Sequence, residues 1–327
     1  MIERVGKARA RANIALAKYW GKSDTQLNLP AVPSISMTLD PLLTETTVEL
    51  REDLASDVFM LNGEASGAAE LTRATQLLDR VRAEAGLSLR ARVDSRNHFP
   101  TASGLASSAS GFAALAAAAR KAAGLPFDAQ KTSALARQSS ASAARSVFGG
   151  YVELPAGVPG DAKLAATPLA APEHWSLCIV VAVTAEGRKA VGSTDGMTHT
   201  KLTSPYYDAW IAAAPRLADE VRAGILSHDL ARVGQAMEQS TLAMHACALA
   251  AAPGLLYFQP ATLAAFARVR ELRQTRQAEV YATMDAGPHV KALCAAADAA
   301  AVSKALSETP GVLRTILAGP GAGVELL

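Results

Sequence analysis

The sequence has few cysteines, and their arrangement excludes a disulfide framework and a clustered metal site. Cys178, Cys247 and Cys294 are odd in number and far apart, which fits neither pattern. We expect them to be small buried residues in a reducing compartment. The first residues also lack the apolar core of a signal peptide. The sequence therefore predicts a cytoplasmic location.

An excess of one charge is missing too, and so are long apolar runs. Lys and Arg number 32 against 30 Asp and Glu, giving a net charge of +2, so we expect no nucleic-acid partner. No apolar run reaches the roughly 20 residues that span a bilayer, so we expect no membrane partner. Half of the 327 residues are hydrophobic. This composition predicts a globular chain, and its length suggests two domains or one large one.

Strand and helix patterns alternate along the chain without a repeating strand–helix–strand order. Strand patterns occur at 9–17, 34–39, 45–51, 176–183 and 280–284. Helical spacing or alanine-rich composition predicts helices at 70–85, 205–222, 226–242, 261–276 and 286–299. A Pro/Gly/Ala segment at 155–172 predicts a boundary between domains at 1–172 and 173–327. This order favours an α+β fold.

A Gly- and Ser-rich segment precedes a long alanine-rich helix. It reads Phe99-Pro-Thr-Ala-Ser-Gly-Leu-Ala-Ser-Ser-Ala-Ser-Gly111. Glycine lets a backbone approach a ligand closely, and a helix N-terminus suits phosphate. Ser107 and Ser108 add hydroxyls that could reach phosphate oxygens or Mg²⁺. A tightly packed helix with serine caps explains the same residues equally well.

Three further segments place charged side chains among small or aromatic residues. Lys18 and Lys22 flank Tyr-Trp-Gly and form either an anion pocket or two solvated surface lysines. Arg145 lies in a Ser- and Ala-rich segment, where its planar fork could hold a carboxylate or the segment could be a simple turn. Asp285 follows a buried strand and precedes Ala-Gly-Pro, as a catalytic acid or base or as a helix cap.

Taken together, these segments resemble the GHMP kinase superfamily and, within it, the diphosphomevalonate decarboxylase family. The nucleotide loop matches as Pro100-Thr-Ala-Ser-Gly-Leu-Ala-Ser-Ser-Ala109. The decarboxylase motifs match as Asn13 to Lys22, Ser140 to Gly150 and Asp285 to Pro288. The resemblance implies a two-lobed GHMP kinase-like fold with a ribosomal protein S5 domain 2-like N-terminal lobe and a ferredoxin-like C-terminal lobe. It also implies a homodimer.

The resemblance implies an activity: ATP-dependent decarboxylation of mevalonate 5-diphosphate to isopentenyl diphosphate. Its implied catalytic residues are Asp285, Lys18 and Arg145. The implied substrate-binding residues are Tyr19, Lys22, Arg73, Ser140, Ser142 and Ser193. The implied ATP-binding residues are Pro100, Ser103, Gly104, Leu105, Ala106, Ser107 and Ser108. Of these, Ser107 and Ser108 are also expected to meet the Mg²⁺ that accompanies ATP.

One departure from the family pattern leaves alternatives open. The family usually carries Gly-Ser-Gly-Ser before the arginine, whereas this chain has Ser139-Ser-Ala-Ser142. Replacing both glycines restricts the backbone where it would wrap the diphosphate. A decarboxylase of mevalonate 5-phosphate or a mevalonate 3-kinase is therefore an alternative. A non-catalytic binding protein on the same fold is a third hypothesis.

Overall fold

The computed structural model describes residues 4–99, 107–187 and 191–327. The elements of the first half are β1 (Val5–Ala17), β2 (Lys22–Asp24), β3 (Leu29–Pro30), β4 (Ser34–Arg51), β5 (Val58–Leu61), β6 (Glu64–Ala65), α1 (Ala68–Ala85), β7 (Arg90–Asn97), α2 (Ser107–Ala122), α3 (Ala129–Ser139), α4 (Ala143–Ser146), β8 (Tyr151–Leu154) and β9 (Thr167–Ala170).

The second half is mainly helical. Its elements are the 3-10 turn η1 (Pro172–His174), β10 (Leu177–Val183), α5 (Ser193–Thr203), α6 (Tyr207–Ser227), α7 (Leu230–Leu249), α8 (Pro260–Gln274), β11 (Val280–Thr283), β12 (Val290–Ala295), η2 (Ala296–Asp298), α9 (Ala299–Ser307), β13 (Arg314–Pro320) and β14 (Glu325–Leu326). The mixed order of strands and helices confirms the predicted α+β class. No helix in the described ranges is both long and apolar enough to cross a membrane.

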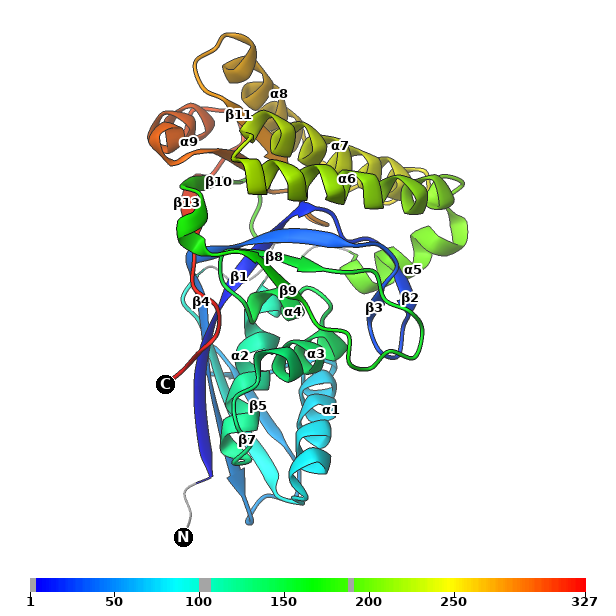
Figure 1. Cartoon of the computed structure of the whole chain (residues 1–327), viewed down its shortest axis with the longest axis vertical. Helices are drawn as coiled ribbons and strands as arrows, with labels where there is room; N and C mark the ends of the chain where they lie inside the picture. Colours follow the sequence, from blue (N-terminus) through cyan, green and yellow to red (C-terminus); the bar gives the residue numbers. More distant parts are fainter. Residues whose placement is uncertain (1–3, 100–106, 188–190) are drawn as a thin grey trace.

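A single large sheet joins the two halves of the chain. Its main path runs β11-β12-β10-β13-β4-β7-β5-β6, with β1 and β8 also paired to β4. The link between the halves is antiparallel pairing of β13 with β4, where Gly319 faces Asp40 and Pro320 faces Leu39. Helices α1, α2 and α3 gather at one end of the molecule and α6 to α9 at the other (Figure 1). The division after residue 172 stays a prediction.

Strand β4 is longer than predicted, because the expected strands at 34–39 and 45–51 are one continuous element. Its pairing with β1 changes register here: Leu43 lies opposite Arg11, whereas Thr38 lies opposite Asn13. The residues in between bulge away from β1, and two of them pair with β13 instead. Proline is tolerated at such bulges, so Pro41 does not end the strand.

The predicted helix at 286–299 is wrong. Residues 290–295 form β12, which lies between β10 and β11 and pairs antiparallel with both. Only the last four residues are helical, three in the 3-10 turn η2 and one at the start of α9. A short apolar strand that is buried on both faces cannot be distinguished from a buried helix by periodicity. The ladder with two neighbouring strands decides the conformation here.

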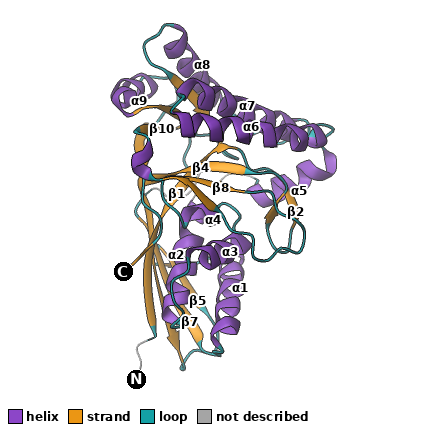
Figure 2. Cartoon of the chain, viewed as in Figure 1, coloured by secondary structure: helices purple, strands orange, loops and turns teal. Residues whose placement is uncertain are grey.

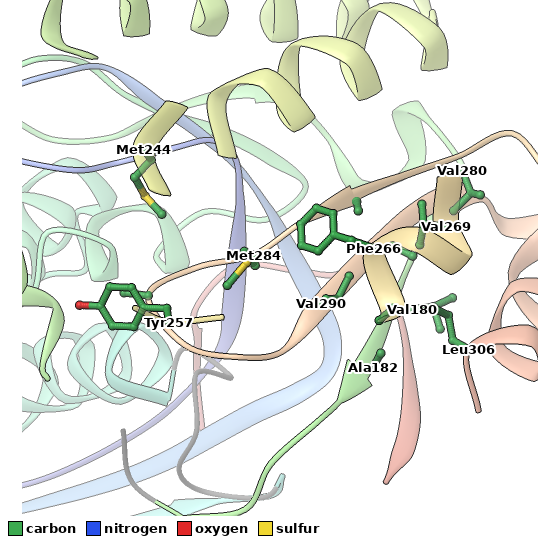
Figure 3. Packing of buried hydrophobic residues seen from close by; sticks show 14 of the residues in the cluster. Val180, Ala182, Met244, Tyr257, Phe266, Val269, Val280, Met284, Val290 and Leu306 are labelled. Atoms are coloured by element: carbon green, nitrogen blue, oxygen red, sulfur yellow. The ribbon is translucent and has the colours of Figure 1, made fainter. Parts of the chain in front are cut away.

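Helices lie against the strands at both ends of the molecule (Figure 2). Buried apolar side chains pack between these helices and the sheet. One core cluster joins β10, β11 and β12 to α7, α8 and α9. Figure 3 shows Phe266 and Val269 of α8 beside Val180 and Val290 of the sheet, within this cluster. Met284 belongs to the same cluster and is 0% exposed. This packing fixes the backbone just after β11, where the candidate site begins.

Candidate active site

The centre of the site is a carboxylate held between two buried lysines. Lys18 Nζ donates to Asp285 Oδ1 at 2.7 Å, and Lys291 Nζ donates to Asp285 Oδ2 at 3.1 Å. The side chains of Lys18 and Lys291 are 1% and 0% exposed, whereas that of Asp285 is 31% exposed. The carboxylate therefore separates two desolvated ammonium groups and still reaches the surface, where a substrate could meet it.

Three elements bring these side chains together. Lys18 directly follows β1, and its backbone N–H donates to Ser240 Oγ of α7 at 3.0 Å. Asp285 follows β11, and its neighbours Met284 and Ala286 are both anchored in the apolar core. Lys291 lies near the start of β12. The cluster thus forms only when the first strand meets the C-terminal half of the sheet.

The charges of the cluster are strongly coupled. Burial by itself raises the pKa of a carboxyl group, but the Lys18 and Lys291 ammonium groups lower the pKa of Asp285 well below its usual value. Burial lowers the pKa of Lys18 to about 8, although the attraction of Asp285 opposes this shift. At neutral pH Asp285 is therefore ionised and a weak base. Lys18 is largely protonated but close to losing its charge.

Arg145 is a second buried cation at the site. It is 2% exposed and donates to Ser36 Oγ at 2.9 Å, to Ser34 Oγ at 2.6 Å and to Asn13 Oδ1 at 3.3 Å. Burial lowers the pKa of Arg145 to about 10, although the charge of Asp285 opposes the shift. Its hydrogen bonds in the described ranges go to neutral acceptors, so its positive charge is left for an anion.

The turn before Arg145 is connected to the same network. Asn13 Nδ2 donates to Ser142 O at 3.0 Å and to Ser146 Oγ at 2.7 Å. The hydroxyls of Ser140 and Ser142 lie 3.2 Å apart. These contacts place the two serines predicted to bind substrate beside the end of β1. Asn13 therefore joins the predicted motif residues into one unit.

Four other residues were predicted to bind substrate, and one of them, Tyr19, packs against the apolar cluster that contains Ala141 of the serine turn. The Tyr19 hydroxyl is buried and has no hydrogen-bond partner in the described part of the chain. Lys22 is 8% exposed, and burial lowers its pKa, with the charge of Arg73 acting in the same direction. The Arg73 guanidinium lies 4.9 Å from the centre of the Phe112 ring. Ser193 begins α5.

The predicted nucleotide loop falls mostly outside the described residues. Pro100, Ser103, Gly104, Leu105 and Ala106 all lie there. Ser107 and Ser108 are the first two residues of α2, and Ser108 is exposed. These two hydroxyls therefore stand at a helix N-terminus, where backbone N–H groups favour a phosphate.

Two groups at the centre were missed by the sequence-based prediction of the site. One is Lys291, the lone charged residue of an apolar strand, which is the signal that could have identified it. The other is His245 of α7, which is 1% exposed. Burial, aided by the charge of Lys18, lowers the pKa of His245 to about 3, so the imidazole is neutral.

Comparisons with known proteins identify the family of the chain. Residues 10–165 match the family model for the diphosphomevalonate decarboxylase-like N-terminal domain. Residues 179–314 match the family model for the mevalonate 5-diphosphate decarboxylase C-terminal domain. The diphosphomevalonate decarboxylase of Candida albicans is 35% identical, over 86% of this chain and 81% of its own length. The phosphomevalonate decarboxylase of Haloferax volcanii is 34% identical, over 87% of each.

Solved structures cover nearly the whole chain. The mevalonate diphosphate decarboxylase of Staphylococcus aureus has a TM-score of 0.94 at 37% identity, covering 100% of this chain and 98% of its own. A second solved structure, the complex of MDDEF with MVAPP, AMPPCP and magnesium, has a TM-score of 0.92 at 39% identity. It covers 99% of this chain and 98% of its own. The fold is thus that of the GHMP kinases, as predicted. Within that class, the chain belongs to the diphosphomevalonate decarboxylase family.

Proposed function

We propose that the chain converts mevalonate 5-diphosphate and ATP to isopentenyl diphosphate, ADP, phosphate and CO₂. The observation that carries this proposal is the ionised Asp285, which is held at the surface by two buried lysines. Such a carboxylate is built to accept a hydrogen bond from a substrate hydroxyl. The relatives of this chain that are named for this reaction support the same assignment.

Asp285 orients the tertiary 3-hydroxyl of the substrate. Because the pKa of Asp285 is low, the carboxylate accepts the hydroxyl hydrogen bond and takes the proton only as the O–P bond forms. The oxygen attacks the γ-phosphorus of ATP, and ADP leaves. Phosphoryl transfer depends on positioning and charge neutralisation, which the Lys18 ammonium supplies beside the reacting oxygen.

Arg145 binds the carboxylate that is lost as CO₂. Its guanidinium offers paired donors that match a carboxylate, and neutral partners hold it in place. After phosphorylation the C3–O bond breaks and phosphate leaves with the bonding electrons. The bond between the carboxylate and the chain then breaks, and its electrons form the new double bond. Carbon dioxide is released.

The 5-diphosphate is assigned to the basic and hydroxyl side chains that the family resemblance implies, including those of the serine turn. These are Tyr19, Lys22, Arg73, Ser140, Ser142 and Ser193. Lys22 is the main cation, since its buried ammonium already feels the repulsion of Arg73. An anion placed between these two charges would relieve that repulsion. The Tyr19 hydroxyl, which has no partner among the residues that the structure describes, supplies a donor for a phosphate oxygen.

ATP is assigned to residues Pro100 to Ser108, with Mg²⁺ carried on its phosphates. The described residues contain no cluster of three or more His, Cys, Asp or Glu that could hold a metal ion. Mg²⁺ needs no such cage, because it usually keeps several waters and binds substrate phosphates. The hydroxyls of Ser107 and Ser108 fit as additional oxygen ligands. Bound in this way, the ion neutralises charge on the transferring phosphoryl group.

The serine turn favours a second candidate, the decarboxylation of mevalonate 5-phosphate. Ser139 is 5% exposed and its hydroxyl has no hydrogen-bond partner in the described ranges. Ala141 is packed against Val152 and Leu154 in a small apolar cluster. At both positions this chain has a side chain where the family usually has glycine. The 34% identity with the phosphomevalonate decarboxylase of Haloferax volcanii also supports this candidate.

An ATP-dependent CO₂-release assay tests the proposal. Purified protein is given mevalonate, its 5-phosphate or its 5-diphosphate, with ATP and Mg²⁺, and both CO₂ and ADP are measured. CO₂ from the 5-diphosphate supports the main proposal, and CO₂ from the 5-phosphate alone supports the second candidate. ADP without CO₂ identifies a 3-kinase. No ADP from any of the three substrates would mean a non-catalytic protein.

The homodimer and the cytoplasmic location complete the proposal. Both come from the family resemblance and the composition. Light scattering on the purified protein tests the first. A mass near 34 kDa, the mass of one chain, would contradict the dimer.

A further inference from the structure

Lys291 is a charged residue in a position that normally holds an apolar one. It lies in β12, between Val290 and Ala292, and pairs with Thr283 of β11 and Val181 of β10. It is 0% exposed. Lysine is almost never fully buried unless it is paired, and taking an ammonium group out of water costs several kcal/mol. A residue of this kind has a specific electrostatic task.

That task is directed at Asp285. Lys291 binds Oδ2 of the carboxylate and Lys18 binds Oδ1, so each oxygen has one ammonium donor. An ionised carboxylate offers about four lone-pair positions, which leaves acceptor positions free on the exposed side. The two donors come from opposite halves of the chain. Rotation of the carboxylate would break both hydrogen bonds, so its orientation is fixed.

We propose that Lys291 is a positioning residue for the reaction: its ammonium group keeps the Asp285 carboxylate ionised and turned so that its free lone pairs meet the substrate hydroxyl. This inference rests on the proposed function. Lys291 does not itself touch the substrate in this scheme; it acts through Asp285. Lys18, by contrast, is shared between Asp285 and the backbone oxygen of Ala15.

The charged and titratable groups that face Asp285 lie on four parts of the chain. They are Lys18 after β1, Lys291 in β12, Arg145 in α4 and the neutral His245 in α7. Burial alone would raise the pKa of this carboxyl, and the cations reverse that effect. Without Lys291, one of the two direct ammonium donors is lost. Asp285 would then begin to take up a proton at a higher pH, and the protonated form cannot accept the hydroxyl hydrogen bond in the same way.

The test compares Lys291→Met with Lys291→Arg, and uses Lys304→Met on the exposed face of α9 as the control. In Lys291→Met, kcat should fall about 10²-fold with little change in KM. The acid limb of its pH profile should rise by about one pH unit or more. Lys291→Arg keeps the charge, so its acid limb should match that of wild type. A wild-type profile for Lys291→Met would overturn the proposal.

Folding is checked separately by circular dichroism. If Lys291→Met does not fold, Lys291→Arg provides the test. An acid limb at higher pH in Lys291→Arg than in wild type would overturn the proposal. A second test places Lys291→Met in an Asp285→Asn background. Because Lys291 acts through Asp285, the residual kcat should drop no further. A further large drop would show an independent role and contradict the proposal.

A measurement without substrate separates this inference from the proposed reaction. The pKa of Asp285 is followed by ¹³C NMR of labelled carboxyl carbons in wild type and in Lys291→Met. A higher pKa in the variant supports the role of Lys291 even if the enzyme acts on a different substrate. An unchanged pKa would refute it even if the decarboxylation is confirmed.

Discussion

Replacing Asp285 with Asn should destabilise the fold and reduce turnover to a small residual rate. The change removes the negative charge between two ammonium groups that are 1% and 0% exposed. Removing one partner of a buried ion pair costs about 3–5 kcal/mol. Asp285 is partly exposed and asparagine still accepts hydrogen bonds, so the lower end, about 3 kcal/mol, applies. At about 2.1 cal/mol/K per residue, this lowers the Tm by about 4 °C.

The pH dependence of this loss has a definite sign. In wild type the pKa of Lys18 is about 8, and in the unfolded chain it is about 10.4. Without the attraction of Asp285, the pKa of Lys18 in the folded state falls further. Between the pKa of Lys18 in the folded state and its pKa in the unfolded state, the unfolded chain binds more protons, so stability rises with pH over that range. In the variant this range begins at a lower pH than in wild type. The deficit should therefore be larger at pH 6 than at pH 8.5.

Thermal unfolding at the two pH values measures the deficit, and Asp53→Asn is the matched control. Asp53 is exposed and pairs with Arg51 at the surface, where an ion pair contributes about 0–1 kcal/mol. Nucleotide binding by Asp285→Asn should persist, which fluorescence titration with an ATP analogue would show. A deficit equal to that of Asp53→Asn, or one that does not change with pH, would refute the electrostatic reasoning.

Three other predictions follow from the same geometry. Arg145→Gln should lower kcat by about 10²-fold or more, whereas Arg216→Gln at an exposed position should leave kcat unchanged. If Arg145→Gln raised only KM, Arg145 would bind substrate and transition state equally. The kcat/KM of the free enzyme should fall above pH 8 as Lys18 loses its proton, and Lys18→Arg should move that limb upward; a limb that stays in place would exclude Lys18 as its source. Chelation with EDTA should stop turnover and excess Mg²⁺ should restore it, whereas activity in EDTA would contradict the role of the ion.

Local patterns in the sequence carried much of the fold and the site. The segment Asn13 to Lys22 and the segment Asp285 to Pro288 are contiguous, so their residue types are visible without any structure. Helix α1 was predictable because its apolar residues recur at helical spacing and face one side. What each motif does chemically remained a choice between two explanations until its partners were known.

The tertiary structure decided those partners. Lys18 and Asp285 are 267 residues apart in the chain, and no local pattern predicts that their side chains meet. The partners of Arg145, Ser34 and Ser36, come from β4 and lie more than a hundred positions away. The roles assigned to these residues stay predictions, but their proximity is a property of the sheet.

Residues 286–299 show why the remainder escaped sequence analysis. Their composition is compatible with a helix, and only hydrogen bonding to β10 and β11 makes part of them a strand. That strand places Lys291 beside Asp285. The sequence by itself determined which charged groups exist and which local segments carry them. Burial and long-range strand pairing decided which charges lie together, because desolvation and Coulomb interactions depend on distances that only the folded chain defines.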